Sequence, residues 1–204
     1  MAAGPQRREP GGSARPVEGV RDLPLAAGAF VGMLVYVLGY LVTYVATNSA
    51  IRNGALGPIS GNEVWRGVGW LFYNAHYVDT VGSLSVFSIT FGTGAANFIT
   101  ESGAFATWLF FVPPVLLLGA GAIVGYQSAR DASPQFAAKT GLTVVPGYLA
   151  LSVVGAFLFR MTSGNSVVGP EPVTAAFLAG LVYPLVLCVV GSVLVSVVAS
   201  AGSD

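Results

Sequence analysis

The chain has a single histidine, His76, in a stretch of side chains that can form hydrogen bonds. A neutral imidazole there could bond to Asn74 or Asp79 and respond to pH. A metal site would need two or three further ligands at suitable spacing, and the neighbouring sequence does not supply them. A structural or interfacial histidine is the favoured interpretation, with pH sensing or ligand contact as the alternative. The candidate residues for a functional or partner contact are His76, Asn74, Tyr73, Asp79 and Trp70.

The remaining sequence carries no pattern that indicates catalysis. The single cysteine, Cys188, falls in an apolar run, where a thiol acts as a small hydrophobic side chain. A serine nucleophile needs a base within reach, and His76 has no glycine-flanked serine near it in the sequence. Phosphate-binding and dinucleotide-binding motifs are absent from the sequence. We therefore expect no enzyme activity, no cofactor and no metal.

The composition excludes an ordinary soluble domain. Of the 204 residues, 54% are hydrophobic and only 9% are charged, whereas a typical soluble domain has roughly 25% charged residues. The net charge is zero, so no global field favours binding to nucleic acid. A helical span needs about 20 apolar residues, and the long charge-free runs can supply several. The sequence predicts an integral protein of the cell membrane, with the lipid bilayer as its first partner.

Four stretches are long and apolar enough to be transmembrane helices. They cover about 25–45, 105–126, 142–161 and 173–199. Prolines interrupt three of these spans and predict kinks: Pro113 and Pro114, Pro146, and Pro184. Small residues recur at every fourth position, as at Gly28 and Gly32 or Gly121 and Gly125, which indicates close helix packing within one chain or between copies. The predicted fold class is an all-α membrane protein with four transmembrane helices.

Basic residues determine the predicted orientation. Residues 1–24 are rich in glycine, proline and charge, so we expect a disordered cytoplasmic tail there, followed by a membrane domain over 25–204. Six basic residues fall on the side of this tail and three on the other side. The six are Arg7, Arg8, Arg15, Arg21, Arg130 and Lys139, and the three are Arg52, Arg66 and Arg160. Both termini are thus predicted to be cytoplasmic, with the connection 46–104 outside.

The outer connection contains a segment with helical periodicity. Residues 63–78 have one apolar helical face and carry two of the three tryptophans. Tryptophan and tyrosine favour the headgroup level of a bilayer. The segment therefore predicts one helix that lies on the outer leaflet or plugs the helix bundle, with Glu63 and Arg66 paired near its start.

A second segment of the connection has β-strand character. Residues 83–91 are rich in β-branched and aromatic side chains and predict a strand or short hairpin with a possible bulge, and with Gly92 and Gly94 as its turn. Serine, threonine, asparagine and glycine make up more than half of 80–100, so this stretch is not expected to cross the membrane. A re-entrant loop is the alternative. Together the helix and the hairpin would form a small extracellular cap.

Two segments resemble a known family. The sequences GWLFYNAHYVDT at 69–80 and WLFFVPPVLLLGAGAIVG at 108–125 are similar to small, uncharacterised integral-membrane proteins of halophilic archaea. The resemblance covers most of the chain after the tail. It implies an archaeal cell-membrane protein, and it implies no functional residues because none are established for the family.

Two classes of function fit these observations. The predicted spans contain no Asp, Glu, His or Lys, which disfavours a proton-coupled carrier. The four carboxylates assigned to the outer side are explained better by solvation than by a cation-attracting mouth; they are Glu63, Asp79, Glu101 and Glu171. The favoured function is therefore a structural or accessory component, with a homo-oligomer or another membrane protein as partner. The alternative is a small oligomeric transporter or channel.

Overall fold

The computed structural model describes residues 25–57, 59, 61–86, 89–128 and 133–201. The predicted disordered tail, 1–24, lies outside the described residues. Four helices in this part of the chain are long and apolar enough to cross a membrane. They cover Leu25–Arg52, Thr107–Tyr126, Pro134–Leu158 and Pro172–Ala201. The four predicted spans are confirmed as helices, although the first, third and fourth are longer than expected.

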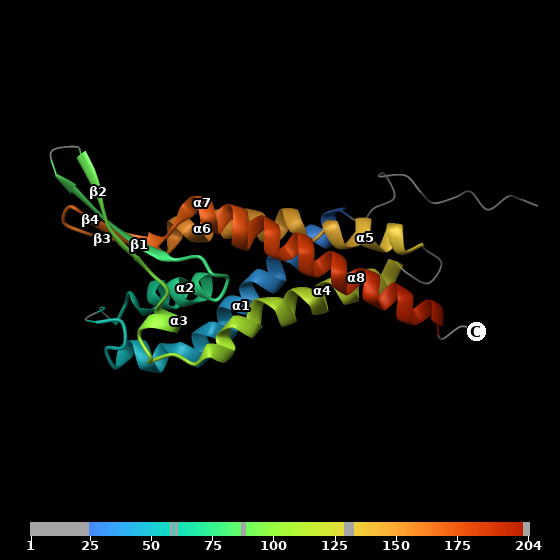
Figure 1. The fold of residues 1–204 in the computed structure, drawn as a ribbon, viewed down its shortest axis with the longest axis horizontal. Coiled ribbons are helices and arrows are strands. Elements are labelled where there is room, and N and C mark those ends of the chain that lie inside the picture. The colour runs from blue at the N-terminus through green and yellow to red at the C-terminus, as the bar shows by residue number, and fades with distance from the viewer. Residues whose placement is uncertain (1–24, 58, 60, 87–88, 129–132, 202–204) are drawn as a thin grey trace, which may run out of the picture.

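The four long helices lie side by side and alternate in direction (Figure 1). The first is α1 (Leu25–Arg52). The second combines a 3₁₀ turn, η2 (Thr107–Phe111), with α4 (Val112–Ser128). The third combines α5 (Pro134–Leu142) with α6 (Val145–Leu158). The fourth combines α7 (Pro172–Thr174), a π-helix η4 (Ala175–Val182), and α8 (Tyr183–Ala201).

Each proline lies in the first turn of an α-helical segment within one of the long helices, and the kinks stay a prediction. Pro113 and Pro114 fall in the first turn of α4, Pro146 in that of α6, and Pro184 in that of α8. The first turn tolerates proline because its backbone N–H groups have no partner within the helix. Before Pro184 the chain is π-helical, which displaces the preceding carbonyl groups from the positions where the proline ring would collide with them.

The third long helix begins well before residue 142, where the sequence predicted it to start. Ser133 caps α5, because its hydroxyl accepts a hydrogen bond from the Phe136 N–H at 3.4 Å, and Pro134 follows in the first turn. Much of the predicted polar link between the second and third spans is therefore helical. Lys139 lies exposed in this helix. The third long helix therefore contains a lysine, whereas the predicted span 142–161 contains none.

A four-stranded antiparallel sheet lies at one end of the bundle (Figure 1), in the order β2-β1-β4-β3. Strands β1 (Thr80–Val86) and β2 (Ile89–Ala96) form the predicted hairpin. Strands β3 (Met161–Ser163) and β4 (Ser166–Pro170) form a second hairpin that the sequence analysis did not predict. The fold is thus mostly helical with a small sheet, rather than all-α.

The turn of the first hairpin was wrongly predicted. Gly92 and Gly94 lie inside β2, which pairs with β1 up to Val86 and Ile89, and residues 87–88 lie outside the described residues. The register shifts beside these glycines, since Gly82 pairs with Gly94 while Ser83 pairs with Gly92. Gly94 has φ of +141°, which only glycine adopts easily, so the glycines serve a β-bulge instead of a turn.

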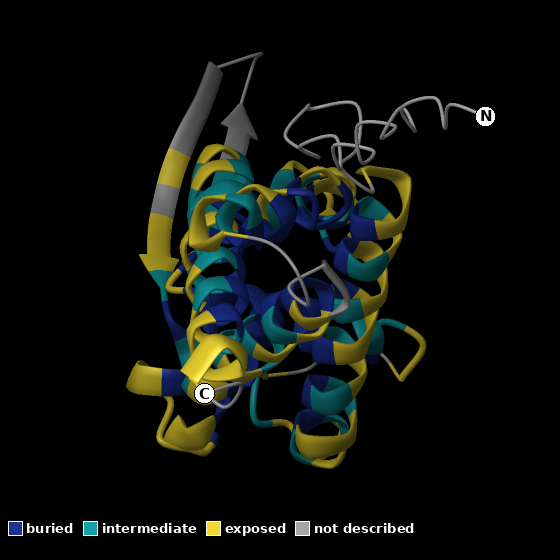
Figure 2. Ribbon diagram, turned by 90° about the vertical axis from the view of Figure 1, so that its right-hand side faces the viewer, coloured by how far each residue is buried: buried dark blue, intermediate teal, exposed yellow. Residues whose placement is uncertain are grey.

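Glycines bring the helices of one chain into close contact. A Cβ atom on Gly32 would lie 2.2 Å from the Val144 carbonyl oxygen, and one on Gly147 would lie 1.8 Å from that of Ala29. A Cβ atom on Gly121 would similarly lie 2.2 Å from the Cys188 carbonyl oxygen. These glycines therefore pack α1 on the third helix and α4 on α8 within the chain. Figure 2 shows that buried residues face the centre of the bundle and exposed residues face outward.

Candidate functional site

The helix predicted for 63–78 enters the bundle instead of lying on its surface. Helix α2 (Val64–Asn74) is buried along its length, and Val68, Leu71 and Tyr73 are completely inaccessible. Of the aromatic rings assigned to the headgroup level, only Tyr77 is strongly exposed, at 57%. The outer-leaflet interpretation is therefore wrong, and the alternative of a helix that plugs the bundle matches the structure. The reason is that α2 has apolar or small side chains on nearly every face, which favours burial.

His76 follows α2 and is completely buried. Its Nδ1 atom lies 2.8 Å from the Phe72 carbonyl oxygen, and its Nε2 atom lies 2.7 Å from the Tyr148 hydroxyl of α6. A carbonyl oxygen can only accept, so Nδ1 carries a proton and donates to Phe72. Burial lowers the pKa of His76 to about 4, although the bond to the Phe72 carbonyl raises it. The imidazole is therefore neutral near pH 7, and its Nε2 atom then accepts the hydrogen bond from the Tyr148 hydroxyl.

A second chain of hydrogen bonds runs beside the histidine. The hydroxyl of Tyr73 donates to the Ser152 carbonyl oxygen, so the hydroxyl of Tyr36, at 3.0 Å, must donate to Tyr73. Burial raises the pKa of Tyr73 well above its usual value. The Ser152 hydroxyl is also buried, and it has no hydrogen-bond partner within the described chain. The cluster thus joins α1, α2 and α6 through neutral groups.

The histidine lies deep within the bundle. Tyr148 stands ten residues before the end of α6 at Leu158, which corresponds to about 15 Å of helix. The ring of His76 also lies 5.1 Å from that of Tyr183, at the start of α8, measured between ring centroids. An ionisable side chain is therefore held inside the bundle, although the four long helices themselves carry no histidine. The sequence analysis missed this because the residue comes from α2.

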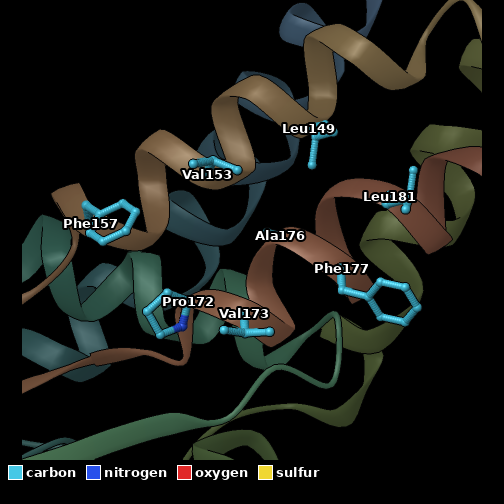
Figure 3. Close-up of a pocket in the computed structure, with 8 residues that line it drawn as sticks. All are labelled: Leu149, Val153, Phe157, Pro172, Val173, Ala176, Phe177 and Leu181. Carbon is cyan, nitrogen blue, oxygen red and sulfur yellow. The ribbon is translucent and has the colours of Figure 1, made fainter.

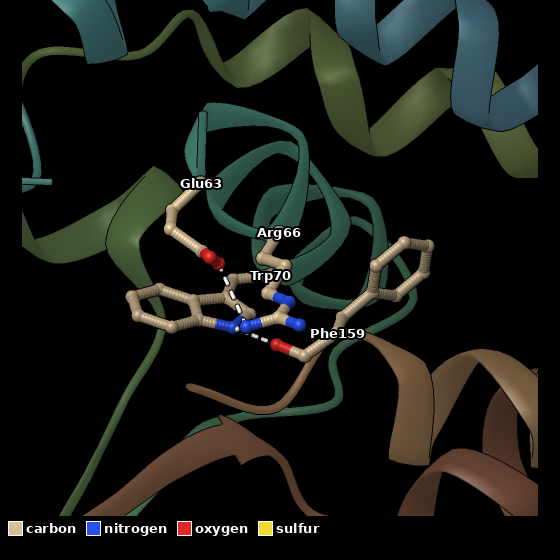
Figure 4. Close-up of polar contacts among 4 residues, drawn as sticks. All are labelled: Glu63, Arg66, Trp70 and Phe159. Atoms are coloured by element: carbon tan, nitrogen blue, oxygen red, sulfur yellow. Dashed lines mark hydrogen bonds and ion pairs between the residues drawn. The ribbon is translucent and has the colours of Figure 1, made fainter. Parts of the chain in front are cut away.

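The other candidate residues have structural contacts. Asn74 holds the end of α2, because its side-chain oxygen accepts from the Phe98 N–H at 2.9 Å and its amide donates to the Val78 carbonyl at 2.9 Å. Trp70 donates from its indole N–H to the Phe159 carbonyl at 2.8 Å (Figure 4). Asp79 is exposed, and the expected bonds from His76 to Asn74 or Asp79 do not form.

Three of the four carboxylates have partners within their own segment of the chain. Glu63 pairs with Arg66 at 2.7 Å, as predicted (Figure 4). Glu101 accepts from the Asn97 N–H at 2.8 Å, and Glu171 caps α7 by accepting from the N–H groups of Val173 and Thr174. Within the described residues, no group of three or more His, Cys, Asp or Glu side chains could hold a metal ion.

Sequence reasoning missed the partners of the candidate residues. Tyr36, Tyr148 and Ser152 complete the cluster around His76 and Tyr73, yet they lie in helices far away in the sequence. The only signal that could have indicated them is that each is a polar residue within an apolar span.

Comparison with known proteins identifies a family. No curated protein and no solved structure matches the chain. Residues 12–199, which are most of the chain, match DUF7978, a family of unknown function. The chain therefore belongs to the DUF7978 family.

Proposed function

We propose that this chain is a multi-pass membrane protein with a structural or accessory role. The support for membrane insertion is that large apolar side chains cover the outside of all four long helices. Phe30 and Val45 of α1, Phe111 and Ile123 of the second helix, Phe157 of α6 and Val198 of α8 are each more than half exposed. A soluble protein would not leave so continuous an apolar surface facing water, whereas lipid tails accommodate it.

The observation that carries the accessory role is the shape of the sheet end. Strand β1 pairs with β4 only over Thr80–Leu84, but the β1–β2 hairpin continues for two further residue pairs, through Val86 and Ile89. The hairpin therefore projects beyond the rest of the sheet (Figure 1). Strand β2 is also an edge strand, so its outer backbone groups have no strand partner within the described chain. A projecting hairpin with an open edge suits contact with another membrane protein or a second copy.

The orientation of the chain in the membrane and its archaeal origin are also part of this proposal. The excess of basic residues beside the tail supports cytoplasmic termini, so the sheet would face outward from the cell membrane. The resemblance of 69–80 and 108–125 to proteins of halophilic archaea supports an archaeal origin. Enzyme activity is not part of the proposal.

One observation favours the second function, a small oligomeric transporter or channel. His76 contacts Tyr148, which lies about 15 Å below the outer end of α6, roughly half of a bilayer core. An ionisable group at that depth is typical of proton and ion pathways. The cluster is, however, held by neutral hydrogen bonds, with only the Ser152 hydroxyl left unpaired in the described chain. A monomer in mild detergent would contradict this second function, because four helices rarely enclose a pathway alone.

The accessory role can be tested with a shortened hairpin. Replacing residues 85–90 with Asn-Gly closes the hairpin at the Leu84–Phe91 pair with a two-residue turn and keeps every pairing between β1 and β4. The native protein should co-purify from its own membrane with a defined partner in fixed proportion. The shortened variant should lose that partner yet remain in the membrane after alkaline extraction.

The matched control is Asn165→Ala, an exposed change at the turn of the other hairpin. It should keep the partner. Equal partner recovery with the shortened variant would contradict a role for the hairpin. Release of the native protein by alkali would contradict membrane integration itself.

A further inference from the structure

We propose that the outer surface between α6 and the π-helix holds one hydrocarbon chain of an anionic lipid, whose phosphate binds Arg160. This inference rests on the proposed membrane location. It goes beyond that location because it assigns a specific site, a ligand class and a charged anchor to one face of the bundle.

The site is an apolar groove of about 530 Å³ between α6 and η4 (Figure 3). Leu149, Val153 and Phe157 line one wall and are spaced one turn apart along α6. Val173, Phe177 and Leu181, with a similar spacing, line the opposite wall. The groove therefore runs along the helix axes for about 12 Å. An elongated groove parallel to the bundle axis matches the direction of a lipid chain.

The groove is open because a small residue forms part of its wall. Ala176 lies between the larger side chains of Val173 and Phe177 (Figure 3). One turn further along, the helices close up, since a Cβ atom on Gly180 would lie 2.7 Å from a methyl group of Leu149. Phe157 and Phe177 are 55% and 61% exposed, so their rings are available to an incoming chain.

A cation stands at one end of the groove. The guanidinium carbon of Arg160 lies 4.7 Å from the centre of the Phe157 ring, and the stem of Arg160 packs close to Gly169. The guanidinium makes no ion pair within the described chain, where Glu63 and Arg66 form the one pair found. Arginine binds phosphate through several donors at once, so a lipid phosphate suits this position.

One acidic side chain, that of Glu171, lies near enough to Arg160 for their charges to interact. Partial burial raises the pKa of Glu171. Hydrogen bonds from Thr174 and Val173 and the charge of Arg160 together lower this pKa by more than burial raises it, so the net shift is downward. Its two oxygens already accept the N–H groups of Val173 and Thr174, which directs the carboxylate to the start of α7. Arg160 therefore keeps its own donors for an incoming anion.

The site can be tested by measuring retained lipid. The full chain is purified in a neutral detergent and incubated with phosphatidylglycerol or phosphatidylcholine of identical chains, and native mass spectrometry then counts the bound lipid. The native protein should retain one phosphatidylglycerol per chain and at least tenfold less phosphatidylcholine. Arg160→Gln should abolish that preference. Ala176→Phe, which fills the groove, should remove retention of both lipids.

The control is Ala27→Phe, the same change at an exposed position of α1 near the opposite end of the bundle, which should retain lipid as the native protein does. Should Ala176→Phe fail to fold, Val153→Trp fills the same groove from a residue that is already 37% exposed. Equal retention by the native protein and the groove variants would overturn the site, and so would equal retention of the two lipids. Loss of self-association in Ala176→Phe with unchanged lipid would assign the groove to a second copy instead.

The membrane proposal fails separately from this one. Release of the protein by alkali would contradict the proposed membrane location. A membrane-embedded protein that retains no phosphatidylglycerol would contradict only the lipid site.

Discussion

Acid should destabilise the folded protein through His76. Burial lowers the pKa of this imidazole to about 4, whereas its value in an unfolded chain is about 6.5. Between these pH values the unfolded chain binds a proton that the folded chain does not. The free energy of unfolding should therefore fall as the pH falls, by about 1.4 kcal/mol per pH unit. The total loss between about pH 6.5 and pH 4 is roughly 3 kcal/mol, and above this window the histidine should have no effect.

A single substitution should remove this sensitivity. In His76→Gln the amide N–H can donate to the Phe72 carbonyl and the amide oxygen can accept from Tyr148, so both hydrogen bonds survive without a titrating group. Thermal unfolding in mild detergent, followed by circular dichroism from pH 7.5 to pH 4.5, measures the difference. For a chain of this size, 1 kcal/mol shifts the Tm by roughly 2–4 °C. The native Tm should therefore fall by roughly 5–10 °C more than that of the variant.

The comparison of the native protein with His76→Gln removes the contribution of the carboxylates to the acid sensitivity. Glu171 also loses stabilisation in acid, since its pKa lies below the ordinary value, but it does so equally in both proteins. Tyr148→Phe provides a second check. It should cost about 1–3 kcal/mol at every pH, because Nε2 loses its donor, while the acid sensitivity remains. Parallel curves for the native protein and His76→Gln would refute the buried, neutral histidine.

Three further substitutions test the packing around the cluster. Gly147→Val should lower stability by at least about 1–3 kcal/mol, because its Cβ would meet the Ala29 carbonyl, whereas Gly119→Val, with open space around it, should not change the Tm. Asn74→Ala should cost about 1–3 kcal/mol by leaving the Phe98 N–H and Val78 carbonyl unpaired, and limited proteolysis should then cut near residues 97–106 faster than in Asp79→Asn. Trp70→Phe should lower the Tm by leaving the Phe159 carbonyl unpaired, and an unchanged Tm would show that water replaces the indole.

The four long helices could be predicted from the sequence because apolar length is a local property. The start of the third helix was missed although Ser133 and Pro134 form a recognisable cap, since the polar residues after them suggested a link. The hairpin of β3 and β4 was missed because its strands are short and gain stability only by pairing with β1.

The candidate site could be predicted only in part, because its contacts join segments far apart in the sequence. His76 and Tyr73 could be selected as polar residues in an aromatic stretch, and both belong to the buried cluster. Their environment could not be predicted, because the same aromatic composition suits a headgroup layer and a bundle core. Tyr148 lies 72 residues away from His76, and only the folded arrangement of α2 against α6 brings their polar atoms together.

The most direct test of the four-span arrangement is the accessibility of its two ends. Ser133 and Asn165 are exposed and lie in the α4–α5 link and the β3–β4 turn, at opposite ends of the bundle. Single cysteines are introduced at these positions in a Cys188→Ala background and treated in intact cells with a membrane-impermeant thiol reagent. Asn165→Cys should label at once, and Ser133→Cys should label only after permeabilisation. Labelling of both from outside would contradict a bundle that crosses the membrane between them, and the reversed pattern would contradict cytoplasmic termini.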